Sequence, residues 1–409
     1  MGDDLRLALM HMSLQRWRAR SGRRIGGPPG AFAGGLRAIP LSVAVVVALG
    51  GAPRNAAAQA PAPPLPATDR FEEPLFSGAA LVHDNDNFPH PGNTLLDDNY
   101  SAAYELRVNG RLVDRLGLTA PLDGFDWLSR VQRRHAAGAR RFHSAQLIGV
   151  IYTPDRIDTA EVQTDDRPYA SLIALTVGRT SVGGPALDRA WSSDLSIGML
   201  GMDAPGDVQR LIHRTRRWMT GRQLPVDPQG WDNQISAGGE PTALYRVGYQ
   251  RRLAGSRPRG PRQHWEVVGG TEGSVGYHTT AAASLSARLG AFTSRFWEFP
   301  RGPSSPAVGQ QERLPGRRWD LFGFAVLRPR VVLYNALVQG QFRHSVHTVR
   351  PRHLLAEWEG GLAGSLPLGS LQLQIVAQFA QGRSADYVGP KARAYTWGTV
   401  GFFLSRSRR

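Results

Sequence analysis

The sequence predicts an all-β protein, an antiparallel outer-membrane β-barrel of about twelve strands with one short active-site helix. Segments of about ten residues recur along the chain, and many alternate apolar and polar residues with the period of two that is typical of strands. The N-terminus has the order of an export signal. No run reaches 18 apolar residues and the mean hydropathy is −0.30, so membrane-spanning helices are excluded.

The N-terminal region predicts export. Several arginines precede an apolar run, Ile39 to Gly50, which is followed by small residues that would allow cleavage after Ala58 or Ala60. This is the order of a secretory signal peptide, and the apolar run is shorter than the roughly 20 residues that a spanning helix needs. A basic tail without a signal is the alternative. We therefore expect a signal peptide at 1–60, a proline-rich spacer at 61–70 and the barrel at 71–409.

The strand-like segments are spaced as in a membrane barrel. Leu371 to Ile375 alternates most cleanly, and Tyr395, Trp397 and Phe403 share one face of the last segment, where aromatic residues match an interfacial girdle. A soluble β-sandwich would show the same alternation, and the export signal favours the barrel. We expect strands near 78–83, 101–109, 144–152, 170–181, 190–200, 242–252, 264–276, 280–292, 320–334, 354–366, 370–381 and 393–404.

Helix is expected only at 205–220, and in a weaker pattern at 124–136. Asp203 is placed to cap the first of these helices, and Pro205 suits its first turn. Gln209 and His213 are four residues apart and so lie on one helical face.

Charge and composition limit the partners. The formal charge is +16, of which the first 60 residues contribute +6 through eight arginines and two aspartates. Lys391 is the only lysine, and the arginines are dispersed over strands and turns. A nucleic-acid partner would predict a clustered basic element, so an anionic lipid surface fits better. Cysteine is absent, which excludes thiol catalysis, thiolate metal sites and disulfides.

Six short motifs, in order along the chain, resemble those of the outer-membrane lipid A 3-O-deacylases of the LpxR type. They are Asn85-Asp86-Asn87-Phe88, Asp98-Asn-Tyr-Ser101, Ile151-Tyr-Thr-Pro-Asp155, Asp165-Asp-Arg-Pro-Tyr-Ala170, Gln209-x-x-x-His213 and Gln229-Gly-Trp-Asp-Asn-Gln234. The resemblance implies a twelve-stranded barrel in the bacterial outer membrane. It also implies Ca²⁺-dependent hydrolysis of the 3′-linked acyloxyacyl ester of lipid A. The implied partners are lipopolysaccharide and outer-membrane lipids, with a monomeric protein.

The resemblance also implies roles for single residues. His213 matches the family's catalytic histidine and Gln209 its helical neighbour, while Asn85 and Asp86 match the pair that serves the metal and the oxyanion. Ser101 stands where the family usually has threonine. The sequence departs from the family pattern in two places. Ala103 stands where the family has glycine, and no lysine stands where the family has one near the site. Because Lys391 is assigned to the last strand region, the role of that lysine is either absent or taken by an arginine.

The implied chemistry is consistent with the residue types. A neutral imidazole can take a proton from water near neutral pH, which makes His213 a candidate base. Oxygen ligands such as Asp86 and Asn85 suit Ca²⁺, which can polarise an ester carbonyl.

Plainer interpretations exist for each motif. His213 could be a surface helix histidine, and residues 84–87 a polar turn. His83 and His90 could indicate zinc, although no ligand quartet has the spacing of a zinc site. Ser101 could be a nucleophile, although no Gly-x-Ser-x-Gly elbow surrounds it. For the whole protein, the alternatives are a noncatalytic lipopolysaccharide-binding or structural barrel, and an outer-membrane phospholipase.

Overall fold

A computed structural model describes residues 71–86, 99–136, 140–184, 186–221, 226–256, 262–298 and 319–406. These residues all belong to one compact unit. The predicted signal peptide at 1–60 and spacer at 61–70 lie outside the described residues, as do Asn87, Phe88, His90 and Asp98.

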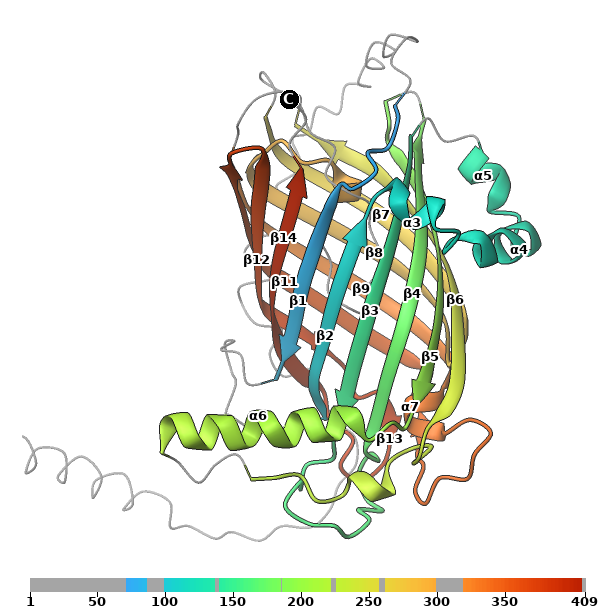
Figure 1. Cartoon of the computed structure of the whole chain (residues 1–409), viewed down its shortest axis with the longest axis vertical. Helices are drawn as coiled ribbons and strands as arrows, with labels where there is room; N and C mark the ends of the chain where they lie inside the picture. Colours follow the sequence, from blue (N-terminus) through green and yellow to red (C-terminus); the bar gives the residue numbers. More distant parts are fainter. Residues whose placement is uncertain are drawn as a thin grey trace, which may run out of the picture. The chain divides into compact units, whose positions relative to one another are not determined.

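Twelve strands close into an antiparallel barrel (Figure 1), as the sequence predicts. In order around the wall they are β1 (Gly78–Asn85), β2 (Tyr100–Asn109), β3 (Arg140–Tyr152), β4 (Ala170–Gly183), β5 (Arg189–Leu200), β6 (Glu240–Gly255), β7 (Gln263–Gly276), β8 (His278–Phe292), β9 (Asp320–Asn335), β11 (Leu354–Leu368), β12 (Leu371–Arg383) and β14 (Tyr395–Arg406). The barrel closes where β1 pairs with β14, from Gly78 opposite Ser405 to Asn85 opposite Gly398.

Short helices and one small sheet lie at the two ends of the barrel. They are α3 (Arg111–Arg115), α4 (Ala120–Leu128), α5 (Gln132–Ala136), α6 (Ala204–Thr220), α7 (Ala336–Gln339), the 3-10 turns η1 (Trp231–Asn233) and η2 (Phe296–Glu298), and the paired strands β10 (Arg350–Pro351) and β13 (Tyr387–Val388). The helix expected at 205–220 is α6. The weaker pattern at 124–136 is divided between α4 and α5, because Arg130 between them adopts a left-handed φ of 62°. In the described part of the chain, no helix has the length and apolar character to cross a membrane.

The outer face of the wall is apolar. Residues of alternate positions point outward and remain exposed, as do Leu81 on β1, Leu106 on β2 and Leu175 on β4. Outward apolar side chains on a closed barrel are what a lipid environment requires. The expected girdle at Tyr395 and Trp397 is wrong, because both are buried inside the barrel with Tyr100, while Phe402 is the exposed aromatic on β14.

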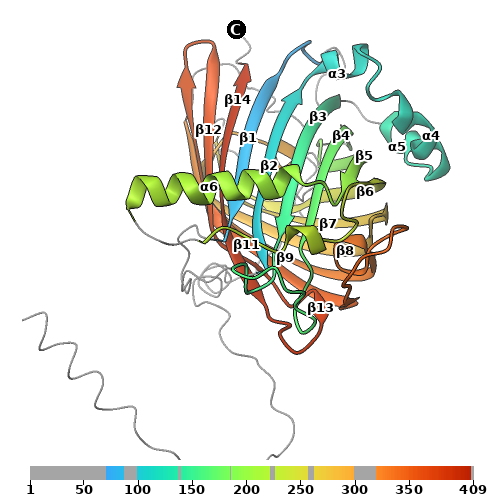
Figure 2. The same ribbon diagram turned by 60° about the horizontal axis from the view of Figure 1, so that its bottom comes forward.

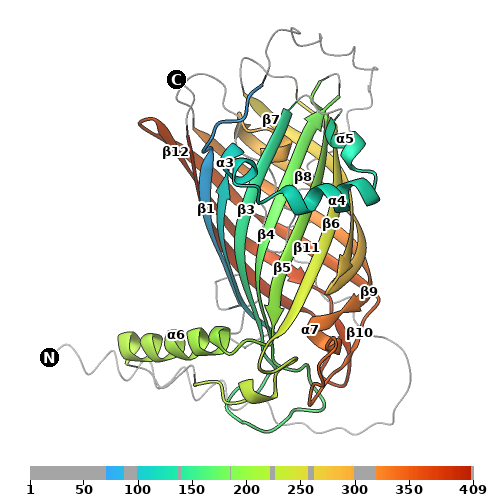
Figure 3. The ribbon, with the colours of Figure 1, turned by 45° about the vertical axis from the view of Figure 1, so that its right-hand side comes forward.

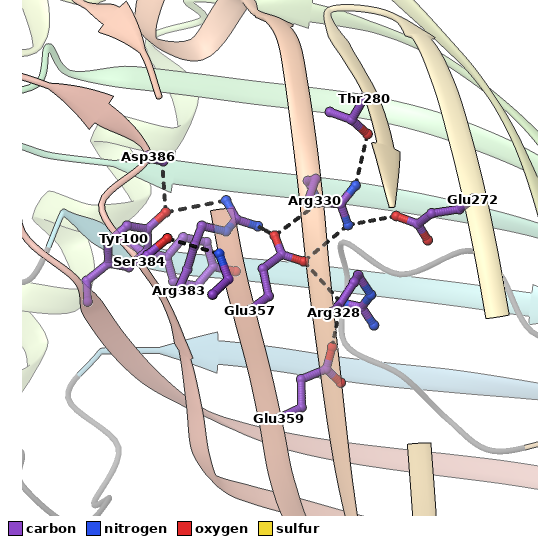
Figure 4. A network of polar contacts seen from close by, with 12 residues as sticks. Tyr100, Glu272, Thr280, Arg328, Arg330, Glu357, Glu359, Arg383, Ser384 and Asp386 are labelled. Atoms are coloured by element: carbon purple, nitrogen blue, oxygen red, sulfur yellow. Dashed lines mark hydrogen bonds and ion pairs between the residues drawn. The ribbon is translucent and has the colours of Figure 1, made fainter. Parts of the chain in front are cut away.

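The lumen is filled rather than open. Apolar clusters occupy both ends: one includes Leu337 of α7 and Trp397, and the other includes Trp297 of η2 and Phe142. Between them lies a network of ion pairs (Figure 4), centred on Glu357. The arginine partners of Glu357 are Arg383 at 2.7 Å, Arg330 at 3.1 Å and Arg328 at 3.3 Å. A cavity of about 90 Å³ remains in the lumen.

Candidate functional site

The six motifs meet at one end of the barrel. In an antiparallel wall, β1, β3 and β5 finish at the same end at which β2, β4 and β6 begin, and this end is opposite the one where β1 starts and β14 finishes. We call the first the site end and the second the terminal end. Figures 1, 2 and 3 agree that α6 lies outside the wall at the site end, and it contacts the wall at β3 and β4. His213 on α6 and Asn85 at the end of β1 therefore belong to the same end of the molecule.

Helix α6 begins and ends where the sequence provides signals for it. Pro205 lies in the first turn, as predicted, and Gly221 closes the helix in the left-handed conformation with φ of 63°. The predicted capping role of Asp203 is wrong. Asp203 occupies the N-cap position, but its side chain makes no cap hydrogen bond and accepts instead from the Gln234 amide at 3.2 Å.

The indole of Trp231 supports the start of α6. Trp231 is buried with Tyr169, Ile151 and other apolar side chains. Gly206 lies directly over the ring, where an added Cβ would be 2.8 Å from its atoms. The indole nitrogen of Trp231 donates to Oε1 of Gln209 at 3.1 Å. Gln209 therefore holds the helix on this support, and the Trp231 segment anchors the connection between α6 and β6.

One hydrogen bond defines the chemical state of His213. Its Nδ1 lies 2.6 Å from the backbone oxygen of Val226. A carbonyl oxygen only accepts, so Nδ1 carries the proton, and in the neutral ring Nε2 must hold the lone pair. The side chain is half-buried. In this tautomer Nε2 is the nitrogen that can accept a proton.

The ends of β1, β2 and β3 are joined by polar contacts. Asn85 shares the outward-facing parity of Leu81 and donates from Nδ2 to the backbone oxygen of Ser101 at 3.1 Å. The hydroxyl of Ser101 lies 2.6 Å from that of Thr153, just beyond β3. Asp86 is 2% exposed. Ser101 thus acts as a hydrogen-bonding residue, in contact with a second hydroxyl rather than with a general base.

Asn99 is a residue of this end that the sequence reasoning missed. It is fully buried, its φ is 53°, and neither polar atom of its side chain has a hydrogen-bond partner among the described residues. A buried amide without partners and a left-handed non-glycine backbone are both costly, and such positions cluster at functional sites. Its position in the motif that ends at Ser101 is the only feature of the sequence that indicates a role for Asn99 at this end.

The oxygen atoms at this end fit a hard cation. Asp86 offers a carboxylate, Asn85 and Asn99 offer amides, and Ser101 and Thr153 offer hydroxyls. Such donors suit Ca²⁺ or Mg²⁺ rather than a soft metal.

A zinc site has no support from the described residues. They contain no cluster of three or more histidine, aspartate or glutamate side chains able to hold a metal. His83 instead stacks on Tyr104 at 4.2 Å, and its Nδ1 contacts the backbone oxygen of Ala103.

The Asp165-Asp-Arg motif is structural. Arg167 is buried, lies 4.0 Å over the Tyr152 ring and is 3.5 Å from Asp386. Asp166 is also buried and accepts from the hydroxyl of Tyr387 at 2.6 Å. These side chains fasten the loop after β3 to the segment before β14.

The single lysine is also at the site end. Lys391 lies in the loop between β13 and β14, where its Nζ is 3.4 Å from Asp165. Arg393 follows in the same loop and contacts Asp155 at 3.3 Å. Because β14 begins at Tyr395, Lys391 lies just before the last strand, in the region where it was expected.

The cavity in the lumen lies elsewhere. Its lining includes Arg246, Arg330 and His278 inside the barrel, and it contains none of the predicted site residues. Asn85 shares the outward parity of Leu81 on β1, so the wall separates its side chain from this cavity.

A family model and a solved structure agree with this fold. The sequence matches the family described as "Outer membrane protein LpxR" over residues 41–404. The structure resembles that of LpxR from Salmonella typhimurium, with 14% identity and a TM-score of 0.58, covering 81% of this chain and 100% of that one. The β-domain of the Bordetella autotransporter BrkA matches with 8% identity and a TM-score of 0.36, covering 82% of this chain and 100% of that chain. Curated protein sequences gave no match.

Proposed function

Because this chain belongs to the LpxR family of outer membrane proteins, we propose that it hydrolyses the 3′-linked acyloxyacyl ester of lipid A with the help of Ca²⁺. The observation that carries the proposal is the hydrogen bond from Nδ1 of His213 to Val226. It orients the ring and fixes the tautomer in which Nε2 can accept a proton.

His213 acts as a general base in this proposal. A water molecule next to Nε2 gives up a proton to it while the oxygen attacks the ester carbonyl, and the protonated imidazole then returns the proton to the leaving alkoxide. No covalent acyl-enzyme is required, since the hydroxyl of Ser101 contacts Thr153 and not an imidazole.

The oxygen donors near the end of β1 would hold the cation. Asp86 supplies the charged ligand, and Asn85 supplies an amide oxygen or donates to the oxyanion. When bound, Ca²⁺ would polarise the ester carbonyl and stabilise the negative charge that develops on its oxygen. The remaining residues keep these donors in place: Asn85 is tied to β2 through Ser101, and β2 to β3 through Thr153.

The surface of α6 suits a lipid substrate. Its solvent-facing side is apolar, with Leu211 64%, Trp218 84% and Met219 73% exposed. Arginines border this face at positions 210, 214, 216 and 217. An amphipathic helix of this kind binds at a lipid interface, and guanidinium groups bind phosphate. Lipid A is an acylated, phosphorylated lipid, and we assign the site end to the leaflet that contains it.

The test is mass spectrometry of lipid A after incubation with the detergent-solubilised protein, with Ca²⁺ or with chelator. We expect the acyloxyacyl mass to be lost only with Ca²⁺. The His213→Ala variant should lower the rate by about 10²- to 10⁴-fold, the usual contribution of a general base. Thr215→Ala is the matched control, because Thr215 lies on the same helix and its hydroxyl only contacts the backbone of Leu211.

The alternatives give different results. Release of fatty acid from phospholipid, with lipid A unchanged, would identify a phospholipase. No change in either lipid would identify a noncatalytic barrel. Full activity of the His213→Ala variant would remove the assigned base whatever the substrate.

A further inference from the structure

A helical segment at the terminal end covers part of the outer wall. The segment α3–α5, residues 111–136, connects β2 to β3 and lies outside the barrel beside β3 to β6 (Figures 1 and 3). Leu122 of α4 is fully buried and packs on Val177 of β4 and Leu195 of β5. This segment is far from the site end and has no part in the proposed hydrolysis.

The wall beneath α4 changes from apolar to polar. Towards the site end, the outward residues Leu175 and Ile197 are 48% and 59% exposed. Towards the terminal end, the outward residues are Arg179, Ser181 and Ser193, all buried under the helices. Because a lipid-facing wall is apolar and its ends are polar, α4 lies at the boundary between hydrocarbon and headgroups.

Aromatic side chains mark the same boundary on neighbouring strands. The rings of Trp191 on β5 and Tyr249 on β6 contact each other at 4.4 Å on the outer face. Trp265 near the start of β7 and Trp319 just before β9 are 40% and 45% exposed. Tryptophan and tyrosine concentrate where a membrane meets water. The aromatic girdle that we expected on the last strand is thus present at the terminal end, on other residues.

The free face of the segment continues this girdle. Trp127 and Leu128 of α4 are 69% and 74% exposed, and Leu116 after α3 is 63% exposed. The adjacent Phe125 stacks on Tyr245 of the wall at 5.2 Å between ring centroids. Exposed apolar side chains of this size, next to a lipid-facing wall, are positioned to enter the same lipid phase.

The charge of the segment is positive. Arg115, Arg130, Arg133 and Arg134 are all exposed, and Arg134 lies 5.3 Å over the ring of Trp191. The exposed carboxylate of Asp123 is already paired with Arg179 at 2.9 Å. Basic side chains around an apolar face are typical of helices that bind anionic lipid surfaces.

A buried polar clamp fixes the segment to the wall. Asp126 of α4 is fully buried and accepts from Tyr245 at 2.9 Å and from Arg179 and Ser193 at 3.1 Å. His135 of α5 contacts Ser181 at 2.8 Å. These contacts therefore fix the position of the apolar face of the segment along the barrel axis.

We propose that the segment α3–α5 is an interfacial anchor that binds the anionic phospholipid leaflet at the terminal end of the barrel. Trp127, Leu128 and Leu116 enter the boundary between headgroups and acyl chains, and the arginines contact lipid phosphates. The anchor resists vertical displacement of the barrel, and it is independent of the reaction at the site end.

The absence of cysteine allows a direct test with single nitroxide labels. We would label Leu128→Cys and Leu116→Cys, with Leu175→Cys as the lipid-facing reference and Glu161→Cys, in an exposed loop at the site end, as the aqueous reference. The protein is reconstituted in nanodiscs of neutral phospholipid, or of neutral mixed with anionic phospholipid. Accessibility to oxygen and to a water-soluble nickel complex then reports depth. A folded barrel is verified by its resistance to SDS before heating.

We expect the labels at 128 and 116 to lie about 5–10 Å below the headgroup surface in anionic nanodiscs, several-fold less accessible to nickel than the label at 161. Neutral nanodiscs, or the added changes Arg115→Gln and Arg133→Gln, should raise nickel accessibility at 128 but not at 175. A label at 128 as accessible as the label at 161 would overturn the anchor. Equal depth in neutral and anionic nanodiscs would overturn its assignment to anionic lipid.

Discussion

The contact between His213 and Val226 illustrates what single residues contribute. The spacing of Gln209 and His213 could be predicted from sequence because helical periodicity is local. The hydrogen-bond partners of the two side chains could not be predicted, because Val226 and Trp231 lie in the segment after α6 and contact the helix only when that segment folds back on it. The burial of Arg167 was missed for the same reason, because its partner Asp386 is more than 200 residues away in the sequence.

Replacement of Asp86 tests whether the proposed oxygen ligands bind Ca²⁺. It is the charged member of the proposed oxygen set, so Asp86→Asn should weaken Ca²⁺ binding by at least tenfold while the barrel remains folded. Calorimetric titration of the detergent-solubilised protein measures this without any need for catalysis. Asp207→Asn is the control, since Asp207 is exposed on α6 and paired with Arg210. Unchanged affinity in Asp86→Asn would exclude Asp86 as a ligand.

At the scale of elements, alternation located all twelve strands and the 3.6 period located α6. The alternation of residues does not show which face of a strand points into the lumen when both faces contain apolar residues. Tyr395 and Trp397 were assigned to the lipid side for this reason, and only the register of β14 against β1 and β12 places them inside. Long-range pairing supplies the information that periodicity lacks.

The position of α6 depends on Gly206. A methyl group there would meet the Trp231 ring at 2.8 Å, so Gly206→Ala should push the helix away from its support and move His213 relative to β1. We expect the deacylation rate to fall by about 10²-fold, the cost of a displacement near 1 Å, with no change in the SDS resistance of the barrel. Ala204→Gly, in the same turn, is the control for helix propensity. Normal activity of Gly206→Ala would show that the support has no role in catalysis.

The docking of α5 should depend on pH. Burial, and then the nearby charges of Arg179, Arg141 and His143, lower the pKa of His135 to about 3 from an ordinary value of 6.5. A released α5 would take up a proton below about pH 6.5, whereas the docked His135 stays neutral until about pH 3. Docking is therefore complete above pH 6.5 and weakens as the pH falls towards 3.

A nitroxide at Gln132→Cys on α5 would report this change as increasing mobility between pH 7 and pH 4. The added change His135→Gln removes the titrating group and should flatten the profile. An identical pH profile with and without His135 would contradict the assignment.

For the whole molecule, the ion pairs of the lumen join neighbouring strands of the wall. Glu357 joins three arginines from β9 and β12. Arg328 and Arg330 also pair with Glu359 and Glu272, so removal of the charge of Glu357 takes the carboxylate at 2.7 Å from the buried guanidinium of Arg383 and weakens the pairing of the other two. Glu357→Gln should lower the free energy of unfolding by about 3–5 kcal/mol, seen as a lower temperature for loss of SDS resistance. Glu161→Gln, in an exposed loop, should leave that temperature unchanged. An unchanged temperature in Glu357→Gln would show that the network is not needed.

The seam between the first and last strands has a consequence for biogenesis. Asp84 on β1 accepts from Thr399 on β14 at 2.6 Å and from Tyr100 on β2 at 2.8 Å, next to the proposed cation ligands. The chain is made from its N-terminus, so this junction can form only after the final strand has arrived. A polypeptide still in transit across the periplasm would possess His213 but not the finished rim that carries the proposed cation ligands. Under the proposed function, the protein would therefore be inactive until its insertion is complete.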